Sequence, residues 1–414
     1  MFAAFSTALS ALDANGVAVA VVGNNLANMN TTGYKESVAY FQDLVSESMN
    51  AGQTQVGFGV APPLTITQFT QGAIQSSSGS LDAAIQGSGF FVVNNNGTTQ
   101  YTRAGSFQVD LSGNLLTPSG QLVQGWMATG GVVDTGGPIG NITVPVGAMQ
   151  APQATQNMTL SANFDASAAT GSASDWSAPV TVYDSLGNAH VLTLNFQQTA
   201  ANTWSCQATV PGADVQGGTA GTPYDVGSPV TLQFNSSGQL TSTTPAEPIT
   251  FAFQPGDGAA PMSVNWNPID SDGASTLTQF AQSSATSATT QDGSAASQLT
   301  QVTMGNGGQL LASYSSGQQV VVGQVAIANV QNPQTLVSVG NNSYQVSADT
   351  AAPAIGAPGT GGRGTIVGGA LESSNVDMAT ELTNLIVLQS AYQANSKVVT
   401  TVDTLAQATT NLIT

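Results

Sequence analysis

Apolar side chains recur at alternating spacings of three and four residues along the end of the chain, residues 371–414. This stretch contains no glycine or proline, and Ser374 and Asp377 near its start favour a helix N-terminus. The period predicts one long amphipathic helix of the kind found in coiled coils and bundles. A helix of roughly 38 residues would be about 57 Å long and would need partners along its length. The main seam consists of Leu385, Leu388, Tyr392, Val399, Val402, Ala406 and Ile413, and Ala391, Val398, Leu405 and Leu412 follow beside it.

The beginning of the chain shows the same spacing, which predicts a second amphipathic helix. Asparagine, threonine and glycine are dense over residues 23–35, so this helix is expected to end there and an irregular connector to begin. Two interpretations remain open: the terminal helices either pair within an ordinary domain or serve as an assembly device. The apolar positions of the first helix are Phe2, Phe5, Leu9, Leu12, Gly16 and Val19.

Between the ends the hydrophobic period changes to two, which predicts antiparallel sheets with one solvated face. Residues 36–47 are the exception and are expected to form a short helix. Residues 271–297 are dominated by small polar side chains and are expected to be a surface linker that contains a domain boundary. Strands are predicted at residues 89–93, 106–111, 180–183, 191–196, 230–234, 249–253, 309–313 and 319–329.

Charge and cysteine content narrow the class of protein. Only 6% of residues are charged, four are basic, and the formal net charge is -18, which argues against binding to nucleic acid or anionic membrane. The single cysteine, Cys206, cannot form an internal disulfide. No apolar run is expected to be long enough to span a bilayer. The N-terminal region has no basic residue before Lys35, so it lacks the charged start of a cleaved secretory signal.

Candidate chemistry is sparse, and we predict no enzyme, cofactor or metal site. The one histidine, His190, is expected to have a surface or packing role. The segment Asp270–Gly273 has two acids and a glycine but lacks the rest of an EF-hand frame, so a surface turn is expected. Residues 361–364 lack the lysine and hydroxyl residue of a phosphate loop. No pair of carboxylates stands out as a glycosidase site.

Motifs at both ends of the chain point to a known family. Residues 24–35, NNLANMNTTGYK, resemble the N-terminal signature of the bacterial flagellar rod and hook proteins, and residues 371–377, LESSNVD, resemble their C-terminal signature. Residues 101–107, YTRAGSF, are similar to the β domain that these proteins share. Residues 183–190, YDSLGNAH, are similar to the outer domain of the hook members. Rod members lack an outer domain of this size, so the region at 149–285 favours the hook branch.

The resemblance implies a mixed α and β fold in which two mainly antiparallel β domains are nested between terminal helices that form a coiled-coil inner domain. The implied division is an N-terminal helix at 1–24, a connector at 25–72, a middle β domain at 73–148 and 286–370, an inserted outer β domain at 149–285, and a C-terminal helix at 371–414. The implied function is a self-assembling subunit of the flexible flagellar hook, which transmits torque from rod to filament.

The resemblance also implies partners and contact residues. The expected partners are further copies of the chain, the distal rod, the hook cap, the hook-filament junction protein and the flagellar type III export apparatus, with no nucleic acid and no membrane insertion. The expected location is the extracellular hook, reached without a cleaved signal peptide. A secreted β-rich adhesin or carbohydrate-binding module with helical multimerising ends is the alternative. The subunit interface is predicted at Phe2, Phe5, Leu9, Leu12, Val19, Asn24, Asn25, Leu26, Asn28, Leu385, Leu388, Tyr392, Val399, Val402 and Leu405.

Overall fold

The computed structural model describes residues 2–44, 47–48, 55–57, 59–171, 175–246, 248–269 and 274–411. The chain forms two compact units, which are described in turn. The first unit comprises Met1–Val146, Gln301–Ser313 and Gln319–Thr414, and the second comprises Gly147–Thr300 and Tyr314–Gln318.

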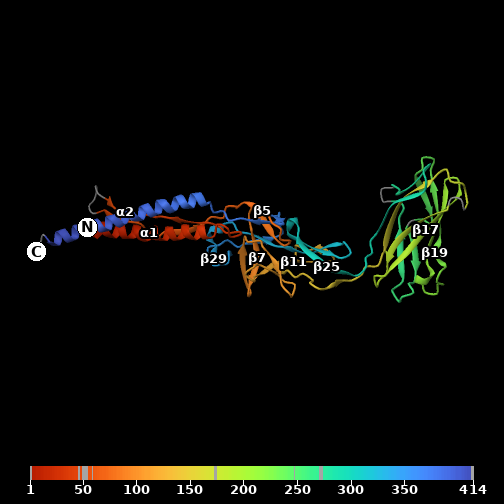
Figure 1. Ribbon diagram of the computed structural model, residues 1–414, viewed down its shortest axis with the longest axis horizontal. Coiled ribbons are helices and arrows are strands. Elements are labelled where there is room, and N and C mark those ends of the chain that lie inside the picture. Colours follow the sequence, from red (N-terminus) through yellow and green to blue (C-terminus); the bar gives the residue numbers. More distant parts are fainter. Residues whose placement is uncertain are drawn as a thin grey trace. The chain divides into compact units, whose positions relative to one another are not determined.

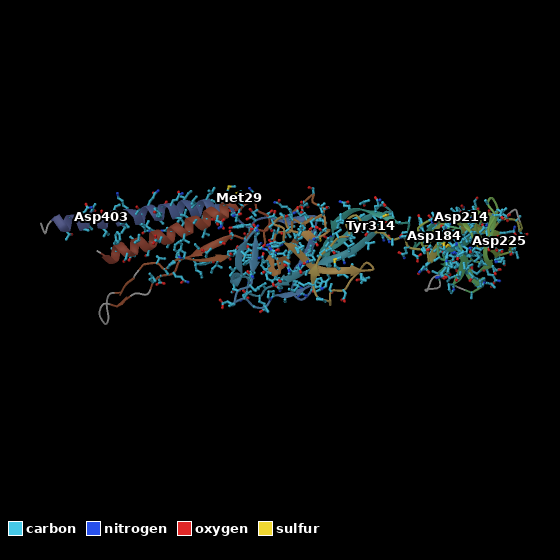
Figure 2. All side chains as sticks on the ribbon, turned by 90° about the horizontal axis from the view of Figure 1, so that it is seen from below. Met29, Asp184, Asp214, Asp225, Tyr314 and Asp403 are labelled. Carbon is cyan, nitrogen blue, oxygen red and sulfur yellow. The ribbon has the colours of Figure 1, made fainter. Side chains whose placement is uncertain are left out.

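Two long helices at the ends of the chain pack against each other in the first unit. Helix α1 spans Phe2–Ala27 and helix α2 spans Met378–Asn411. They lie side by side and run antiparallel, as Figure 1 shows. Met29, just after α1, and Asp403, near the end of α2, therefore lie at opposite ends of the helix pair (Figure 2). The predicted terminal helices are confirmed.

The rest of the first unit is β structure. Its main antiparallel path runs in the order β26–β27–β11–β7–β8–β30–β29, and shorter strands pair with β11, with β7 or with one another. The strands of this path are β26 (Gln309–Tyr314), β27 (Gln319–Val325), β11 (Leu122–Thr129), β7 (Phe90–Asn95), β8 (Thr98–Thr102), β30 (Ser343–Gln345) and β29 (Val337–Gly340). The shorter strands are β9 (Gln108–Val109), β10 (Leu115–Leu116), β12 (Val132–Val133), β13 (Gly140–Asn141), β28 (Ile327–Asn329) and β31 (Ala354–Gly356).

Among the described residues, four two-stranded pairs are separate from this sheet. In two of them a strand from the N-terminal half pairs with a strand that immediately precedes α2, so both ends of the chain enter the same region. The pairs are β1 (Ser37–Tyr40) with β4 (Leu64–Thr67), β2 (Glu47–Ser48) with β3 (Gln55–Val56), β5 (Ile74–Ser76) with β33 (Ala370–Glu372), and β6 (Ala83–Gln86) with β32 (Thr365–Gly368).

The second unit is a β sandwich. One sheet is an antiparallel meander in the order β16–β17–β18–β19–β20, with strands Trp176–Tyr183, Ala189–Ala200, Thr203–Pro211, Pro223–Phe234 and Leu240–Thr244. The other has the order β21–β22–β15–β23, with β24 also paired to β15; these strands are Ile249–Phe253, Met262–Trp266, Asn157–Asp165, Leu277–Phe280 and Ala285–Gln291. Strand β15 runs parallel to β22 and β23, an exception in a mainly antiparallel fold. Strand β14 (Met149–Gln150) pairs with the start of β25 (Ser297–Met304).

Alternation of apolar and polar residues builds the sandwich core. Leu192, Leu194 and Phe196 of β17 are at most 1% exposed, while their neighbours along the strand point outward. Phe164 of the facing sheet lies in edge or tilted contact with Phe196 and Trp204. The predicted strands at 191–196, 230–234 and 249–253 are confirmed, because all of their inward positions belong to one buried cluster.

Three expectations from the sequence are wrong. Residues 37–40 form strand β1, so the short helix expected at 36–47 is not formed there. The region expected to be a linker, 271–297, contributes β23 and β24, because its threonines and serines suit the solvated edge of a sheet. Ala4–Ala27 in α1 has a mean hydropathy of 1.5 and the length to cross a membrane, contrary to the expectation of no such run. In the structure this helix packs against α2 and β1.

Candidate assembly interface

Helix α1 has two apolar faces of different character. Small side chains are buried at Ala8, Ala14 and Ala18, with Val22 and Asn25 continuing the same face. Within the described residues α1 packs against both α2 and β1, and small buried side chains allow such elements to approach closely. The larger side chains predicted for the interface lie elsewhere: Phe5 is 40% exposed and Leu9 46%, whereas Leu12, Val19 and Leu26 are half-buried. The side chain of Phe2 lies outside the described residues.

The residues of the apolar stripe predicted for α2 are half-buried at some positions and exposed at others. Leu385, Leu388, Val399 and Val402 are half-buried, and their three-four spacing places them on the side that packs against α1. Tyr392 is 47% and Leu405 54% exposed. Further apolar side chains that were not among the predicted interface residues are exposed on α2: Leu382, Ile386, Val387 and Val398, at 44–64%. We call these six residues, together with Phe5 and Leu9, the exposed apolar surface of the helix pair.

A groove of about 230 Å³ adds to this apolar surface where the helices meet β1. Its walls come from α1, the β1 region and the first half of α2. Phe41, one of its lining residues, is 47% exposed. The neighbouring Tyr40 is 46% exposed. A single chain therefore leaves large aromatic and aliphatic side chains in water next to a depression that could receive such side chains.

Asn25 has a role that the sequence did not indicate. It is 1% exposed, and its side chain donates a hydrogen bond to the Ser37 carbonyl at 2.8 Å and another to Glu381 Oε1 at 3.2 Å. It accepts from the Ser37 amide at 3.0 Å and from the Tyr34 hydroxyl at 3.1 Å. Burial, followed by the nearby Glu381 and Glu36, raises the pKa of Tyr34, so the phenol remains a hydrogen-bond donor. Asn25 thus joins the end of α1 to β1 and α2.

The other asparagines predicted for the interface lie around this junction. Asn24 is exposed, and Asn28 is half-buried and donates its side-chain amide to the Asn24 carbonyl at 2.9 Å, closing the end of α1. Gly33 follows with φ of 69°, and an added Cβ would lie 2.6 Å from the Ala104 amide nitrogen. Only glycine can adopt this conformation against such close backbone.

A buried ion cluster lies at the same junction. Lys35 Nζ is 2.6 Å from Glu372 Oε1, and Arg103 Nη1 is 3.2 Å from Glu372 Oε2, with side chains that are at most 4% exposed. Lys35 also donates to the Thr70 carbonyl at 2.6 Å, and Arg103 to the Gly87 carbonyl at 2.9 Å. Burial lowers the pKa of both bases, and the Glu372 carboxylate opposes that shift.

The two sequence signatures therefore meet in space. The Gly33 amide donates to the Glu372 carbonyl at 2.8 Å, and the Glu36 amide donates to Asn375 Oδ1 at 2.7 Å. Asp377 then begins α2 by accepting from the Thr380 amide at 2.7 Å. Sequence reasoning identified both signatures but missed the pairing of Lys35 and Arg103 with Glu372. The available signal was that two of the four basic residues of the chain lie within the family motifs.

Models of four flagellar domains match this chain. They are the flagella basal body rod protein at residues 5–35, the flagellar hook protein FlgE/F/G D1 domain at 84–163, the flagellar basal body protein FlaE D2 domain at 134–294, and the flagellar basal body rod FlgEFG protein C-terminal domain at 367–412. Terminal helices held together by both signatures, with β domains between them, therefore define an axial protein of the bacterial flagellum.

Relatives that match over nearly the whole chain show to which family of flagellar axial proteins it belongs. The chain is 32% identical to the flagellar hook protein FlgE of Escherichia coli strain K12, over 99% of this chain and 100% of that protein. It is 32% identical to FlgE of Treponema pallidum over 95% of each chain. The crystal structure of Helicobacter pylori flagellar hook protein FlgE2 has a similar fold, with TM-score 0.52 and 14% identity over 71% of this chain and 99% of that one. The chain belongs to the flagellar hook protein FlgE family, non-enzymatic structural subunits of the flagellar hook.

Proposed function

We propose that copies of this chain polymerise into a tube through the exposed apolar surface of the helix pair. The family implies polymerisation with itself. The observation that supports this route is that α1 and α2 already pack against each other within the chain, while Phe5, Leu9 and Leu405 remain 40–54% exposed. A contact between different surfaces of successive copies does not close on itself and generates a helical polymer.

The proposed polymer is a flexible joint that transmits torque from rod to filament. In this proposal the inner domain is made of residues 1–24 and 371–414, the connector of 25–72, the middle domain of 73–148 and 286–370, and the outer domain of 149–285. The residues predicted for the subunit interface contribute in two ways. The exposed ones contact the next copy, and Asn25 holds the connector in the geometry that presents them.

The proposal includes the hook's location and its other partners. We infer that the chain is exported by the flagellar type III apparatus without cleavage and that it lies outside the cell between the distal rod and the hook-filament junction protein, with the hook cap at the growing end. The flagellar hook proteins to which this chain is similar support this location.

Paired substitutions on α2 test the proposed route. Leu405 is 54% exposed, so Leu405→Asp is expected to leave the single chain folded and to abolish sedimentable polymer. Burying a leucine contributes about 1.5–3 kcal/mol, and an unpaired charge in its place costs more. Thr404→Asp is the matched control, because adjacent helix positions are turned by about 100°. Polymer yield is measured by sedimentation and electron microscopy, and folding by circular dichroism.

Equal polymer yield from Leu405→Asp and Thr404→Asp would show that the exposed apolar surface does not contact the next copy. Discrete oligomers in place of tubes from the unmodified chain would favour the adhesin-like alternative. Curved tubes of uniform width would support the hook function.

A further inference from the structure

His190 is buried in the second unit, not placed on its surface. The residue is 4% exposed, and its ring makes an edge contact with Phe253, with centroids 5.9 Å apart. It stands near the start of β17, directly after the turn that follows β16. Of the surface or packing role expected for His190, the structure therefore shows the packing position. Its surroundings are polar on both sides of the ring.

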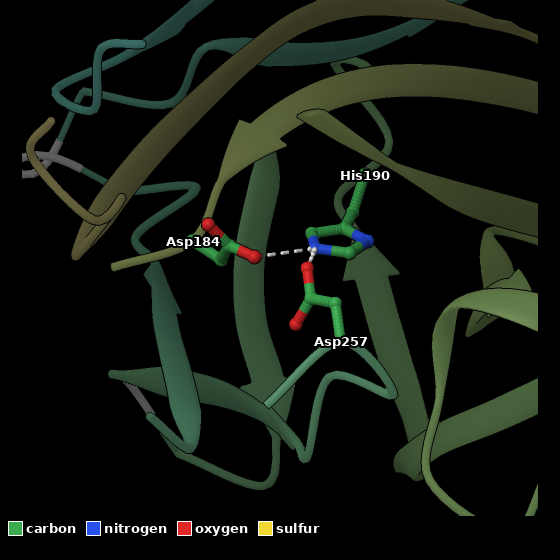
Figure 3. Close-up of side chains that lie close together, drawn as sticks. All are labelled: Asp184, His190 and Asp257. Atoms are coloured by element: carbon green, nitrogen blue, oxygen red, sulfur yellow. Dashed lines mark hydrogen bonds and ion pairs between the residues drawn. The ribbon is translucent and has the colours of Figure 1, made fainter. Parts of the chain in front are cut away.

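Three carboxylates surround the imidazole. His190 Nε2 lies 3.1 Å from Asp184 Oδ2 and 3.9 Å from Asp257 Oδ2, and Nδ1 lies 3.5 Å from Asp214 Oδ2 (Figure 3 shows the first two). Nδ1 is buried without a hydrogen-bond partner. A neutral imidazole carries a single proton, so it cannot donate toward carboxylates on both sides at once. The cluster therefore has an excess of negative charge.

No basic side chain of the second unit can balance that charge. Its residues include ten acids, Asp165, Asp175, Asp184, Asp214, Asp225, Glu247, Asp257, Asp270, Asp272 and Asp292, and no lysine or arginine. The three carboxylates around His190 therefore have no lysine or arginine of the second unit as a partner.

The carboxylates are held in place by their own hydrogen bonds. Asp184 Oδ1 accepts from the amides of Leu186 and Asn188 at 2.8 and 2.9 Å, so Oδ2 is directed toward the ring. Asp257 Oδ2 accepts from the Asn188 side chain at 2.7 Å. The three atoms Asp184 Oδ2, His190 Nε2 and Asp257 Oδ2 lie within 4.8 Å of one another. Two ligand atoms of a tetrahedral zinc ion are about 3.4 Å apart. This separation lies between the 3.1 Å from His190 Nε2 to Asp184 Oδ2 and the 3.9 Å from Nε2 to Asp257 Oδ2.

We propose that Asp184, His190 and Asp257 bind a divalent cation of the zinc class. Imidazole nitrogen with two carboxylates suits such an ion better than calcium or magnesium, which prefer oxygen ligands alone. The ion binds Nε2 in place of a proton, so the proton of the neutral ring lies on Nδ1 and points toward Asp214. Asp214 then orients the ring, as a carboxylate commonly does for a histidine that binds a metal.

The site would join the two sheets of the sandwich. Asp184 and His190 belong to the β16–β17 hairpin of one sheet, whereas Asp257 lies in the loop between β21 and β22 of the other. A bound ion adds cross-links between these sheets and stabilises the second unit according to its affinity and concentration. This role is structural and independent of the proposed polymer contacts on α1 and α2.

Metal titration of the full chain tests the site. Chelator-treated protein is titrated with Zn²⁺ near neutral pH by calorimetry, and one ion per chain is expected. Asp257→Asn preserves size and is expected to weaken binding at least tenfold. Asp225→Asn is the matched control, because Asp225 is an exposed aspartate of β19 in the same unit. Circular dichroism checks that both variants fold.

The single histidine supplies a second readout that needs no variant. Nuclear magnetic resonance of the unmodified chain reports one imidazole, and Zn²⁺ is expected to shift its signals. No stoichiometric binding, equal weakening by both variants, or Zn²⁺ binding with unmoved imidazole signals would overturn the proposal. Calcium binding as tight as zinc binding would overturn the assigned class of ion.

Discussion

Removing the charge of Glu372 is the most direct test of the junction beneath the helices. Glu372→Gln keeps the size of the side chain but leaves Lys35, which is 0% exposed, and Arg103, 4% exposed, without their carboxylate. Removing one partner of a buried ion pair costs about 3–5 kcal/mol, because the remaining charge is not solvated. At about 1.4 kcal/mol per factor of ten, opening of this region should become more frequent by roughly 10²-fold or more.

Hydrogen exchange followed by mass spectrometry measures this change locally. Peptides that cover residues 30–40 and 366–380 are expected to lose protection, whereas peptides from the second unit serve as an internal reference. Urea unfolding gives the corresponding shift in midpoint. The local measurement is needed because a chain with two compact units does not have a single free energy of unfolding.

Glu36→Gln is the matched control, because it makes the same substitution one residue from Lys35. Burial raises the pKa of Glu36, with further contributions from Glu381 and Asp377, so its charge is unfavourable in the folded chain. Its neutral form favours folding, and this contribution is lost as pH rises through its raised pKa. Glu36→Gln is therefore expected to be neutral or stabilising near pH 7.

The stability lost in the Glu372→Gln variant is expected to depend on pH in a definite direction. Burial lowers the pKa of Lys35, and loss of Glu372 removes the carboxylate that opposes this shift. The folded variant should therefore release the Lys35 proton at lower pH than the unfolded chain, and its stability deficit should shrink as pH rises into the alkaline range. A Glu372→Gln chain no less protected than Glu36→Gln would refute the assignment of this cluster as the junction.

Two further predictions concern single positions. Gly33→Ala should destabilise the first unit by about 1–3 kcal/mol or more, because φ is 69° and the added Cβ would lie 2.6 Å from the backbone. Urea unfolding measures this loss. Gly97→Ala is the control, because Gly97 also has a positive φ but nothing lies within 4 Å of its added Cβ; equal losses of stability would exclude the close contact as the cause. Cys206 is 0% exposed and burial raises the pKa of its thiol, so a thiol reagent should modify it only after the second unit unfolds, and rapid labelling of the folded chain would contradict its buried position.

The periodicity of the sequence was sufficient to predict the terminal helices and most of the sandwich strands. Burial on one face imposes the spacing of 3.6 on a helix and of two on a strand, and both patterns are visible without tertiary information. The inward positions of β17 and β19 were predicted in this way. The same method failed at 37–40 and 285–291, where short or polar strands take their identity from the strand beside them.

Only the tertiary structure decided which face of each helix is used within the chain. The large apolar side chains of α1, Phe5 and Leu9, suggested a partner, yet they are exposed in the single chain, and the buried positions of α1 include Ala8, Ala14 and Ala18. A hydrophobic period indicates which face of a helix is buried in the functional state. It does not show whether that face is buried within the same chain or against the next copy.

The sequence also did not indicate which charged side chains lie next to each other. Lys35 and Glu372 are 337 positions apart, and His190 meets Asp257 from the facing sheet, so no local spacing connects them. The sequence by itself determined the family, the terminal helices and the low number of charges. The fold determined where those charges meet, because burial makes a distant carboxylate the required partner of a base that water cannot reach.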